Sequence, residues 1–246
     1  MPSFLKDFSK FSGDGSVNED GLTLEEFLEE YDHDKYERPS VTADIMVFKH
    51  SGELKDVSGE LSLLMIKRRN HPSIGYWALP GGFCEVREDF IDSARRELFE
   101  ETGLTGIPME KINTFGEVDR DPRYRIITGA FIALVDDTVN KPVANDDAAD
   151  ARWFNVVFSE ESEENITEAG IEILRRIYRI TLTSDDADKI VCSARAAVSS
   201  NTNTILRETH YEVIESSNIA FDHARFILNG LLHIRQLINH PIFDII

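Results

Sequence analysis

Three glutamates, Glu97, Glu100 and Glu101, lie within the short segment RRELFEETGL. In an α-helix they occupy positions i, i+3 and i+4, so their side chains share one face of the helix. Carboxylates held so close repel one another, and a solvated helix face would normally intersperse lysines among them. A hard divalent cation such as Mg²⁺ or Mn²⁺ takes oxygen ligands and would remove this repulsion. The spacing therefore favours a metal site over a solvated acidic surface.

The flanking residues predict a helix over residues 89–102 that positions these acids. Asp89 suits the N-cap, where its carboxylate would accept backbone N–H groups. Gly103 suits the C′ position, where a left-handed residue ends the helix, and Leu104 can make the accompanying apolar contact. A different face of the helix carries apolar residues that can pack against a sheet, namely Ile91, Ala94 and Leu98.

The segment before this helix, LPGGF, allows the backbone to turn tightly and a carbonyl group to approach a metal without a crowding side chain. Glu88 and Arg96 form an oppositely charged pair that would fasten this loop to the helix. In that role, Arg96 would orient the glutamates and would not bind a substrate.

The remaining chain predicts an α+β protein with helices packed on a mixed sheet. A capping box at Thr23 and Glu26 predicts a short helix within an N-terminal extension, residues 1–38. Apolar runs predict strands over 39–49, 60–69, 125–135 and 151–158, and alternation predicts further strands within 177–183, 189–198 and 205–215. Residues 159–165, SEESEEN, have the composition of a charged loop. A last helix begins near residue 221 and keeps helical spacing to Ile238.

Composition limits the classes of function. The chain has 246 residues and a formal net charge of −19, which disfavours binding to nucleic acid. A phosphate-bearing substrate would therefore need a metal or a few arginines in its site. No apolar run approaches the length of a membrane span. The two cysteines, Cys84 and Cys192, predict free thiols in a reducing cytoplasm.

Residues 82–104, GFCEVREDFIDSARRELFEETGL, resemble the Nudix box of the Nudix hydrolases, and every specified position of that box is filled. The segments GYWALPGGF, RDPR, DDAADARWF and AFDHARFI resemble the ADP-ribose pyrophosphatase-like branch of the family. The resemblance implies a Nudix α/β/α sandwich with a mixed β-sheet over residues 39–246, with a β-rich insertion at about 159–216 before the last helix.

The same resemblance implies roles for the box residues. Glu97, Glu100 and Glu101 would be catalytic metal ligands for Mg²⁺ or Mn²⁺, together with the Gly81 carbonyl group. Structural roles in the motif fall to Gly82, Glu88, Arg96 and Gly103. The implied reaction is metal-dependent hydrolysis of the pyrophosphate bond in a nucleoside diphosphate derivative, foremost ADP-ribose, to AMP and ribose 5-phosphate. Dinucleoside polyphosphates, nucleotide sugars and NADH remain alternative substrates.

The catalytic base stays open at this point. Family members often place an acid in a loop before a WF pair, and here Asp147 is the first candidate, ahead of Asp146 and Asp150. A solvated acidic loop is an equal interpretation of that segment, and Glu100 or Glu101 could serve as the base instead.

Three arginines are candidates for binding the substrate. Arg120 and Arg123 precede a core strand that would adjoin the box, and arginine suits bidentate contacts with phosphate or ribose. Arg68 is a weaker candidate at the end of another strand. Surface arginines are the alternative interpretation, and His223 is expected to cap or pack the last helix.

Two alternatives to the enzyme follow from the same resemblance. One relative of this branch is a transcriptional regulator that senses ADP-ribose and binds DNA through a C-terminal winged helix. The expected last helix leaves few residues for such a domain, and the intact glutamates favour catalysis. The second alternative is a non-catalytic module that binds nucleotides. We expect no nucleic-acid or membrane partner, a cytoplasmic location, and a homodimer involving the insertion or the N-terminal helix.

Overall fold

The structure is a computed structural model that describes residues 7–136 and 148–239. Its centre is one mixed sheet with the strand order β10-β9-β8-β7-β2-β1-β6-β5. Strands β1 and β6 run parallel, while the other paired strands are antiparallel. The strands are β1 (Ser40–His50), β2 (Leu61–Arg68), β3 (Trp77–Ala78), β4 (Gly81–Phe83), β5 (Glu110–Phe115), β6 (Ile126–Asp136), β7 (Ala148–Glu168), β8 (Ile171–Ser184), β9 (Val191–Asn201) and β10 (Thr209–Ser217).

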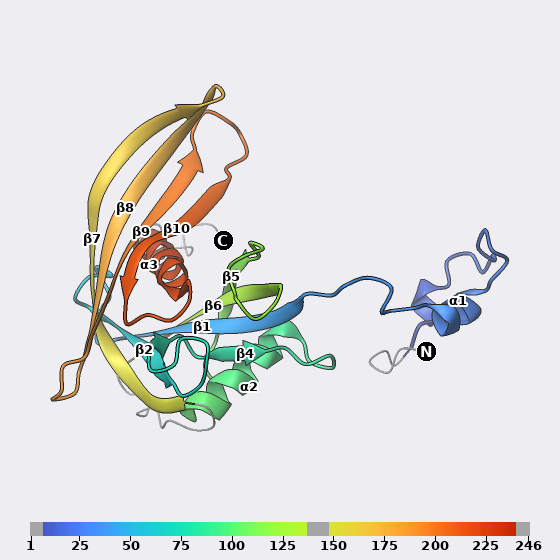
Figure 1. The fold of residues 1–246 in the computed structure, drawn as a ribbon, viewed down its shortest axis with the longest axis horizontal. Helices are drawn as coiled ribbons and strands as arrows, with labels where there is room; N and C mark the ends of the chain where they lie inside the picture. The colour runs from blue at the N-terminus through green and yellow to red at the C-terminus, as the bar shows by residue number, and fades with distance from the viewer. Residues whose placement is uncertain (1–6, 137–147, 240–246) are drawn as a thin grey trace.

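The helices of the described part are α1 (Leu24–Glu30), α2 (Phe90–Thr102) and α3 (His223–Asn239), preceded by a 3₁₀ turn, η1 (Ser9–Phe11). Thr23 and Glu26 form the predicted capping box of α1. Figure 1 shows α1 at the end of an extended segment that leads into β1. No helix among the described residues is both long and apolar enough to cross a membrane.

Helices α2 and α3 cover opposite faces of the sheet. Successive side chains of β1 point to opposite faces, and apolar residues on both faces need to be covered. Ile45 and Val47 belong to the apolar cluster that includes Leu98 of α2. Met46 and Phe48 point to the other face, in the cluster that contains much of α3. The predicted α/β/α sandwich is therefore confirmed.

The prediction of a charged loop over residues 159–165 was wrong. Strand β7 runs unbroken through this segment and pairs with β8 along its length. The acids are compatible with a strand because β8 and β9 supply arginines beside them. Examples are the pairs Glu163–Arg176, at 2.7 Å, and Glu161–Arg195, also at 2.7 Å. The three strands predicted after this segment are confirmed as parts of β8, β9 and β10, whereas β5 was missed.

Strand β7 joins two regions of the molecule (Figure 1). Its first part, from Ala148 to Asn155, pairs with β2 of the central sheet. Its second part pairs with β8, which continues into β9 and β10. We call the region formed by residues 159–217 the extension. Its outermost strand, β10, is interrupted by an irregularity in register between Val213 and Glu215.

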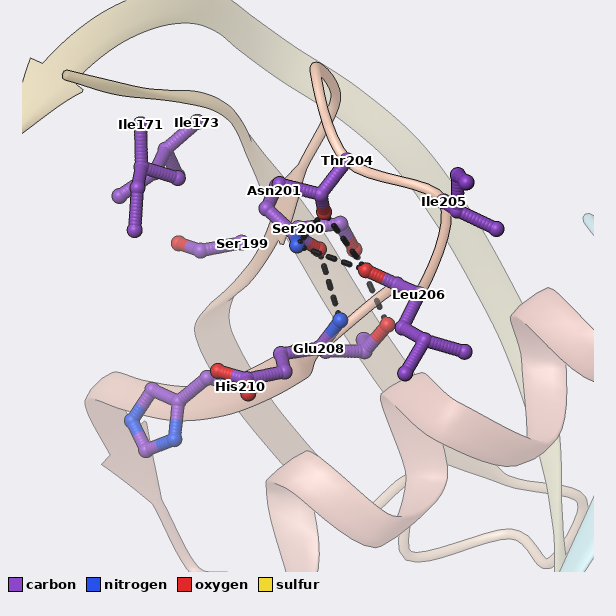
Figure 2. A pocket seen from close by; sticks show the side chains of 11 residues that line it. Ile171, Ile173, Ser199, Ser200, Asn201, Thr204, Ile205, Leu206, Glu208 and His210 are labelled. Atoms are coloured by element: carbon purple, nitrogen blue, oxygen red, sulfur yellow. Dashed lines mark hydrogen bonds between the residues drawn. The ribbon is translucent and has the colours of Figure 1, made fainter.

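The far end of the extension carries a surface hollow of about 930 Å³ (Figure 2). Asn201 fastens the loop that borders it, because its side-chain amide donates to the Leu206 carbonyl group (2.8 Å) and its oxygen accepts from the Glu208 N–H group (2.7 Å). Ile205 and Leu206 of this loop are highly exposed. Figure 1 places this end of the sheet opposite to α2.

Candidate active site

Helix α2 presents its acids to the glycine loop at β4. Ala94 and Leu98 are buried against the sheet, which leaves the face with Glu97 and Glu101 towards that loop. Gly103 ends the helix with a left-handed backbone, at φ 71°, as predicted. Asp89 lies at the N-cap position, but its side chain makes no capping hydrogen bond, so that detail of the prediction was wrong.

Two glycines of the loop, Gly81 and Gly82, allow its backbone to lie close to neighbouring groups. The Gly81 N–H group donates to Glu101 Oε2 at 2.8 Å. Gly81 has φ 153°, and a Cβ at this position would lie 2.3 Å from the Ala43 carbonyl oxygen. A Cβ at Gly82 would lie 2.4 Å from Glu97 Oε2. A side chain at Gly81 would thus collide with β1, and one at Gly82 would collide with the Glu97 carboxylate of α2, so the loop fits between them because both positions are glycine.

Arg96 connects the loop before α2 to two of the glutamates. Its guanidinium group donates to both oxygens of Glu88, at 2.8 and 3.1 Å, as the sequence predicted. A single nitrogen, Nη1, also donates to Glu97 (2.7 Å) and Glu100 (3.0 Å). The remaining contact is with the Phe83 carbonyl group at 2.9 Å. Arg96 therefore fixes the positions of Glu97 and Glu100 relative to the loop.

The electrostatic surroundings of the acids favour a bound cation. Burial raises the pKa of Glu101 to about 8, although the hydrogen bond from Gly81 opposes this shift. Burial also raises the pKa of Glu97, against the opposing effect of Arg96. Glu101 in particular forms no ion pair with a described residue that would offset its burial, and a metal ion would supply that positive charge.

The available donors fit a hard divalent cation, since Glu97, Glu100, Glu101 and the Gly81 carbonyl group all offer oxygen. Across residues 7–136 and 148–239, no group of three or more His, Cys, Asp or Glu side chains is arranged tightly enough to hold a metal by itself. Arg96 accounts for part of this, because it occupies one oxygen of Glu97 and one of Glu100. The ligand roles of these residues stay predictions.

The acids form one wall of a groove of about 440 Å³, which we call the acidic groove. A volume of this size lies within the range of small-molecule sites. Basic side chains line the same groove, and two of them were predicted to bind substrate, Arg68 and Arg123. Arg69 also lines it. The structure thus brings the predicted acids and two predicted arginines together.

Arg120 lies elsewhere. Its side chain is 5% exposed and forms a two-pronged pair with Asp222, at 3.0 and 2.9 Å, just before α3. A further hydrogen bond of 2.6 Å reaches Thr128 Oγ1. Arg120 lines a smaller cavity of about 60 Å³ beside the acidic groove. Its predicted contact with substrate stays a prediction, while its observed contacts join α3 to β6.

Three of the candidates for the base, Glu100, Glu101 and Asp150, lie in α2 and β7. Asp147 and Asp146 lie outside the described residues. Asp150 lies in β7, where it accepts a 2.6 Å hydrogen bond from Arg152. Glu100 and Glu101 line the acidic groove, so either can face a substrate there.

Two buried polar residues, His223 and Asp44, lie behind the glycine loop. His223 Nδ1 accepts a 2.9 Å hydrogen bond from the Leu79 N–H group, and burial lowers the pKa of His223 to about 4. It is thus a neutral packing residue, as predicted, which also anchors the loop. Its Nε2 lies 3.8 Å from Asp44, whose pKa burial raises to about 7. A lone acid within the apolar run ADIMVF was the signal available for Asp44.

Comparisons with known proteins agree with this arrangement. A NUDIX domain family model matches residues 39–173, which is more than half of the chain. An ADP-ribose pyrophosphatase of Methanocaldococcus jannaschii is 35% identical over 121 residues, covering 49% of this chain and 64% of the relative. The ADPR-responsive transcriptional repressor NtrR of Acinetobacter baylyi is 35% identical over 111 residues, covering 44% of this chain and 42% of the relative. The chain thus spans less than two thirds of the length of either relative.

Among solved structures, a MutT/nudix family protein from Enterococcus faecalis superimposes with a TM-score of 0.61 at 28% sequence identity. The superposition covers 89% of this chain and 72% of that protein. It therefore reaches well beyond the segment that the family model matches.

Proposed function

The chain belongs to the NUDIX domain family, and from this premise we propose that it hydrolyses the pyrophosphate bond of nucleoside diphosphate derivatives, with ADP-ribose as the first candidate. The observation that carries the proposal is the acidic groove, in which Glu97, Glu100 and Glu101 lie opposite arginines. An anionic diphosphate is stabilised by positive charge in its binding site. The acids can bring that charge by binding a metal cation, and the arginines carry it themselves. The similar pyrophosphatase of Methanocaldococcus jannaschii supports ADP-ribose as the substrate.

Bound Mg²⁺ or Mn²⁺ would neutralise the phosphates and acidify the attacking water. Arg96 keeps Glu97 and Glu100 in position, and Gly81 keeps Glu101 facing the groove. A carboxylate takes the proton from water as the new P–O bond forms and the bridging P–O bond breaks. For ADP-ribose, the products are AMP and ribose 5-phosphate. We retain Asp147 as the candidate base, with Glu100 and Glu101 as alternatives.

Release of AMP from ADP-ribose with and without Mg²⁺ or Mn²⁺ tests this proposal directly. We expect Glu101→Gln to lower kcat on the order of 10³-fold, because the amide keeps the shape of the side chain but loses its charge. Asp92→Asn is the matched control, since Asp92 lies on the same helix but is half exposed and pairs with Arg95. Equal turnover by Glu101→Gln and the unaltered protein would contradict the proposed site.

A sensor of ADP-ribose is the second candidate function, favoured by the similarity to the NtrR repressor. The net charge of −19 weighs against a DNA-binding role for this chain. A gel-shift assay with operator-like and random duplexes separates the candidates. Tight, sequence-specific binding that ADP-ribose releases, combined with absent hydrolysis, would favour the sensor.

The homodimer and the cytoplasmic location stay predictions. Light scattering checks the first, and a monomeric mass at working concentration would contradict it.

A further inference from the structure

The loop at the far end of the extension holds two adjacent apolar side chains in water. Ile205 is fully exposed and Leu206 is 80% exposed. Isolated apolar residues are ordinary on a protein surface, whereas a contiguous apolar patch marks a site of interaction. Here the patch is contiguous, because Ile171 and Ile173 form the opposite wall of the hollow that this loop borders (Figure 2). We call the hollow and the loop of residues 202–208 the tip.

Hydrogen bonds hold the loop in its projecting position. The Thr202 N–H group donates to the Glu172 carbonyl group at 2.8 Å, and the Asn203 side-chain amide donates to the Gly170 carbonyl group at 3.1 Å. These contacts tie the loop to the turn between β7 and β8, while Asn201 ties its other end to β9. A loop that is already ordered loses less conformational entropy when a partner binds it.

The hollow carries little charge in a chain that is strongly acidic. Charged residues make up 29% of the chain, whereas Glu208 is the one Asp, Glu, Lys or Arg among the eleven described residues that line the hollow. Nearby on β8, Arg175 is paired with Glu164 at 3.3 Å and with Glu212 at 2.8 Å. Two copies of a chain with a net charge of −19 repel one another, so contact between copies is favoured where the surface is nearly uncharged.

A surface that has both a projecting loop and a hollow can match a second copy of itself. In a dimer with twofold symmetry, each contact from one copy to the other is accompanied by the reverse contact. The Ile205 loop of each copy then enters the hollow beside Ile171 of the other, and both apolar groups leave water together. Because each tip is used once, the assembly closes at two copies.

We propose that the tip is the interface of a homodimer, in which Ile205 and Leu206 of each copy fill the hollow of the other. The sequence left the insertion and the N-terminal helix α1 both open for this role. The tip shares no lining residue with the acidic groove, so each copy keeps a complete site of its own. A stable interface takes about 800 Å² from each partner, so the strands that border the hollow also contribute.

Sedimentation equilibrium of the full chain measures the dimer dissociation constant. We expect Ile205→Glu to raise it by about 30-fold or more, as for a central residue of an interface. The variant should stay folded, as circular dichroism can check, because Ile205 is fully exposed. Ile171→Glu, on the opposite wall, should act in the same direction. Val191→Glu is the matched control, because Val191 is 50% exposed and lies at the other end of β9.

Salt distinguishes this apolar contact from an interface made of the exposed ion pairs of the extension. Salt screens the repulsion between two acidic copies, so a rise from about 50 to about 500 mM NaCl should lower the dissociation constant at least about twofold. An increase in the dissociation constant would overturn the apolar contact.

Phe27→Glu on α1 tests the other candidate for the interface and should leave the dissociation constant unchanged. Loss of the dimer in this variant, with Ile205→Glu still dimeric, would place the interface at the N-terminal helix and overturn the proposal. Equal dissociation constants for Ile205→Glu, Val191→Glu and the unaltered chain would also overturn it. So would a monomeric mass of the unaltered chain at its highest soluble concentration.

Discussion

Ion pairs occur both around the acidic groove and along the extension, but their surroundings differ. Arg120 and Asp222 have side chains that are 5% and 16% exposed, whereas those of Arg176 and Glu163 in the extension are 41% and 45% exposed. Water screens the second kind of pair, and its contribution to stability is small. A buried pair contributes chiefly because removing one partner leaves the other charge without compensation.

Ion pairs have different roles in these two regions. Around the groove, ion pairs fix where the functional side chains lie, as Arg96 does for Glu97 and Glu100. In the extension, they allow a highly charged segment to form a strand on an exposed surface. Substitutions in the two regions should therefore have effects of very different size.

The largest effect is expected from Arg120→Met. Loss of the guanidinium group leaves Asp222 with Arg225 as its ion-pair partner among the described residues and should lower the free energy of unfolding by about 3–5 kcal/mol. Urea unfolding measures this change. Adding Asp222→Leu to the variant should recover part of the loss, since the uncompensated carboxylate is then removed. A loss below about 1 kcal/mol would show that this buried pair contributes no more to stability than an exposed pair.

The next effect concerns His223 and pH. Burial lowers its pKa to about 4 from an ordinary 6.5, so the unfolded chain binds a proton where the folded chain does not. The associated stability is present above pH 6.5 and is lost as the pH falls towards 4, by up to about 3 kcal/mol. His223→Asn keeps an acceptor for the Leu79 N–H group but cannot titrate. Unfolding curves across this range should therefore fall less steeply for the variant, and parallel pH profiles would contradict the assignment.

A smaller effect is expected from Arg96→Lys, measured as the Mg²⁺ concentration that supports half-maximal hydrolysis. Lysine keeps the charge, but one ammonium group cannot hold Glu88, Glu97 and Glu100 together. Misplaced ligands should weaken metal affinity about 10- to 100-fold. Arg95→Lys is the control, since Arg95 pairs with Asp92 on the exposed side of α2. Equal metal dependence in both variants would show that Arg96 does not position the acids.

The smallest effect is expected from Arg176→Gln in the extension. Its pair with Glu163 is exposed, so the free energy of unfolding should change by less than about 1 kcal/mol. Hydrolysis of ADP-ribose should not change. A loss as large as that of Arg120→Met, measured by the same urea titration, would show that the extension depends on its ion pairs as strongly as the groove does.

The sequence could predict the parts of the site that depend on local spacing. The glutamates on one face of α2, the Glu88–Arg96 pair and Gly103 at the helix end are set by residues a few positions apart. The pair of Arg120 and Asp222 joins residues 102 positions apart, so no local pattern reveals it. The contact of Phe221 with Arg123 was equally hidden, because it joins two distant parts of the chain.

The errors in the predicted fold have similar physical reasons. Residues 159–165 have the composition of a loop, and only the arginines of the paired strands make a strand favourable there. Strand β5 was missed because its segment, EKINTF, buries little besides Phe115 and shows no clear alternation. In both cases the deciding partners belong to other strands.

The irregularity in β10 has a consequence for how molecules of this protein meet one another. β10 is an outermost strand of the sheet, with backbone groups that another chain could extend by pairing. The break in register between Val213 and Glu215 interrupts that template, and Glu212 and Glu215 place charged, half-exposed side chains on this strand. The long sheet can therefore end in water with little tendency to grow into fibrils or other open-ended aggregates.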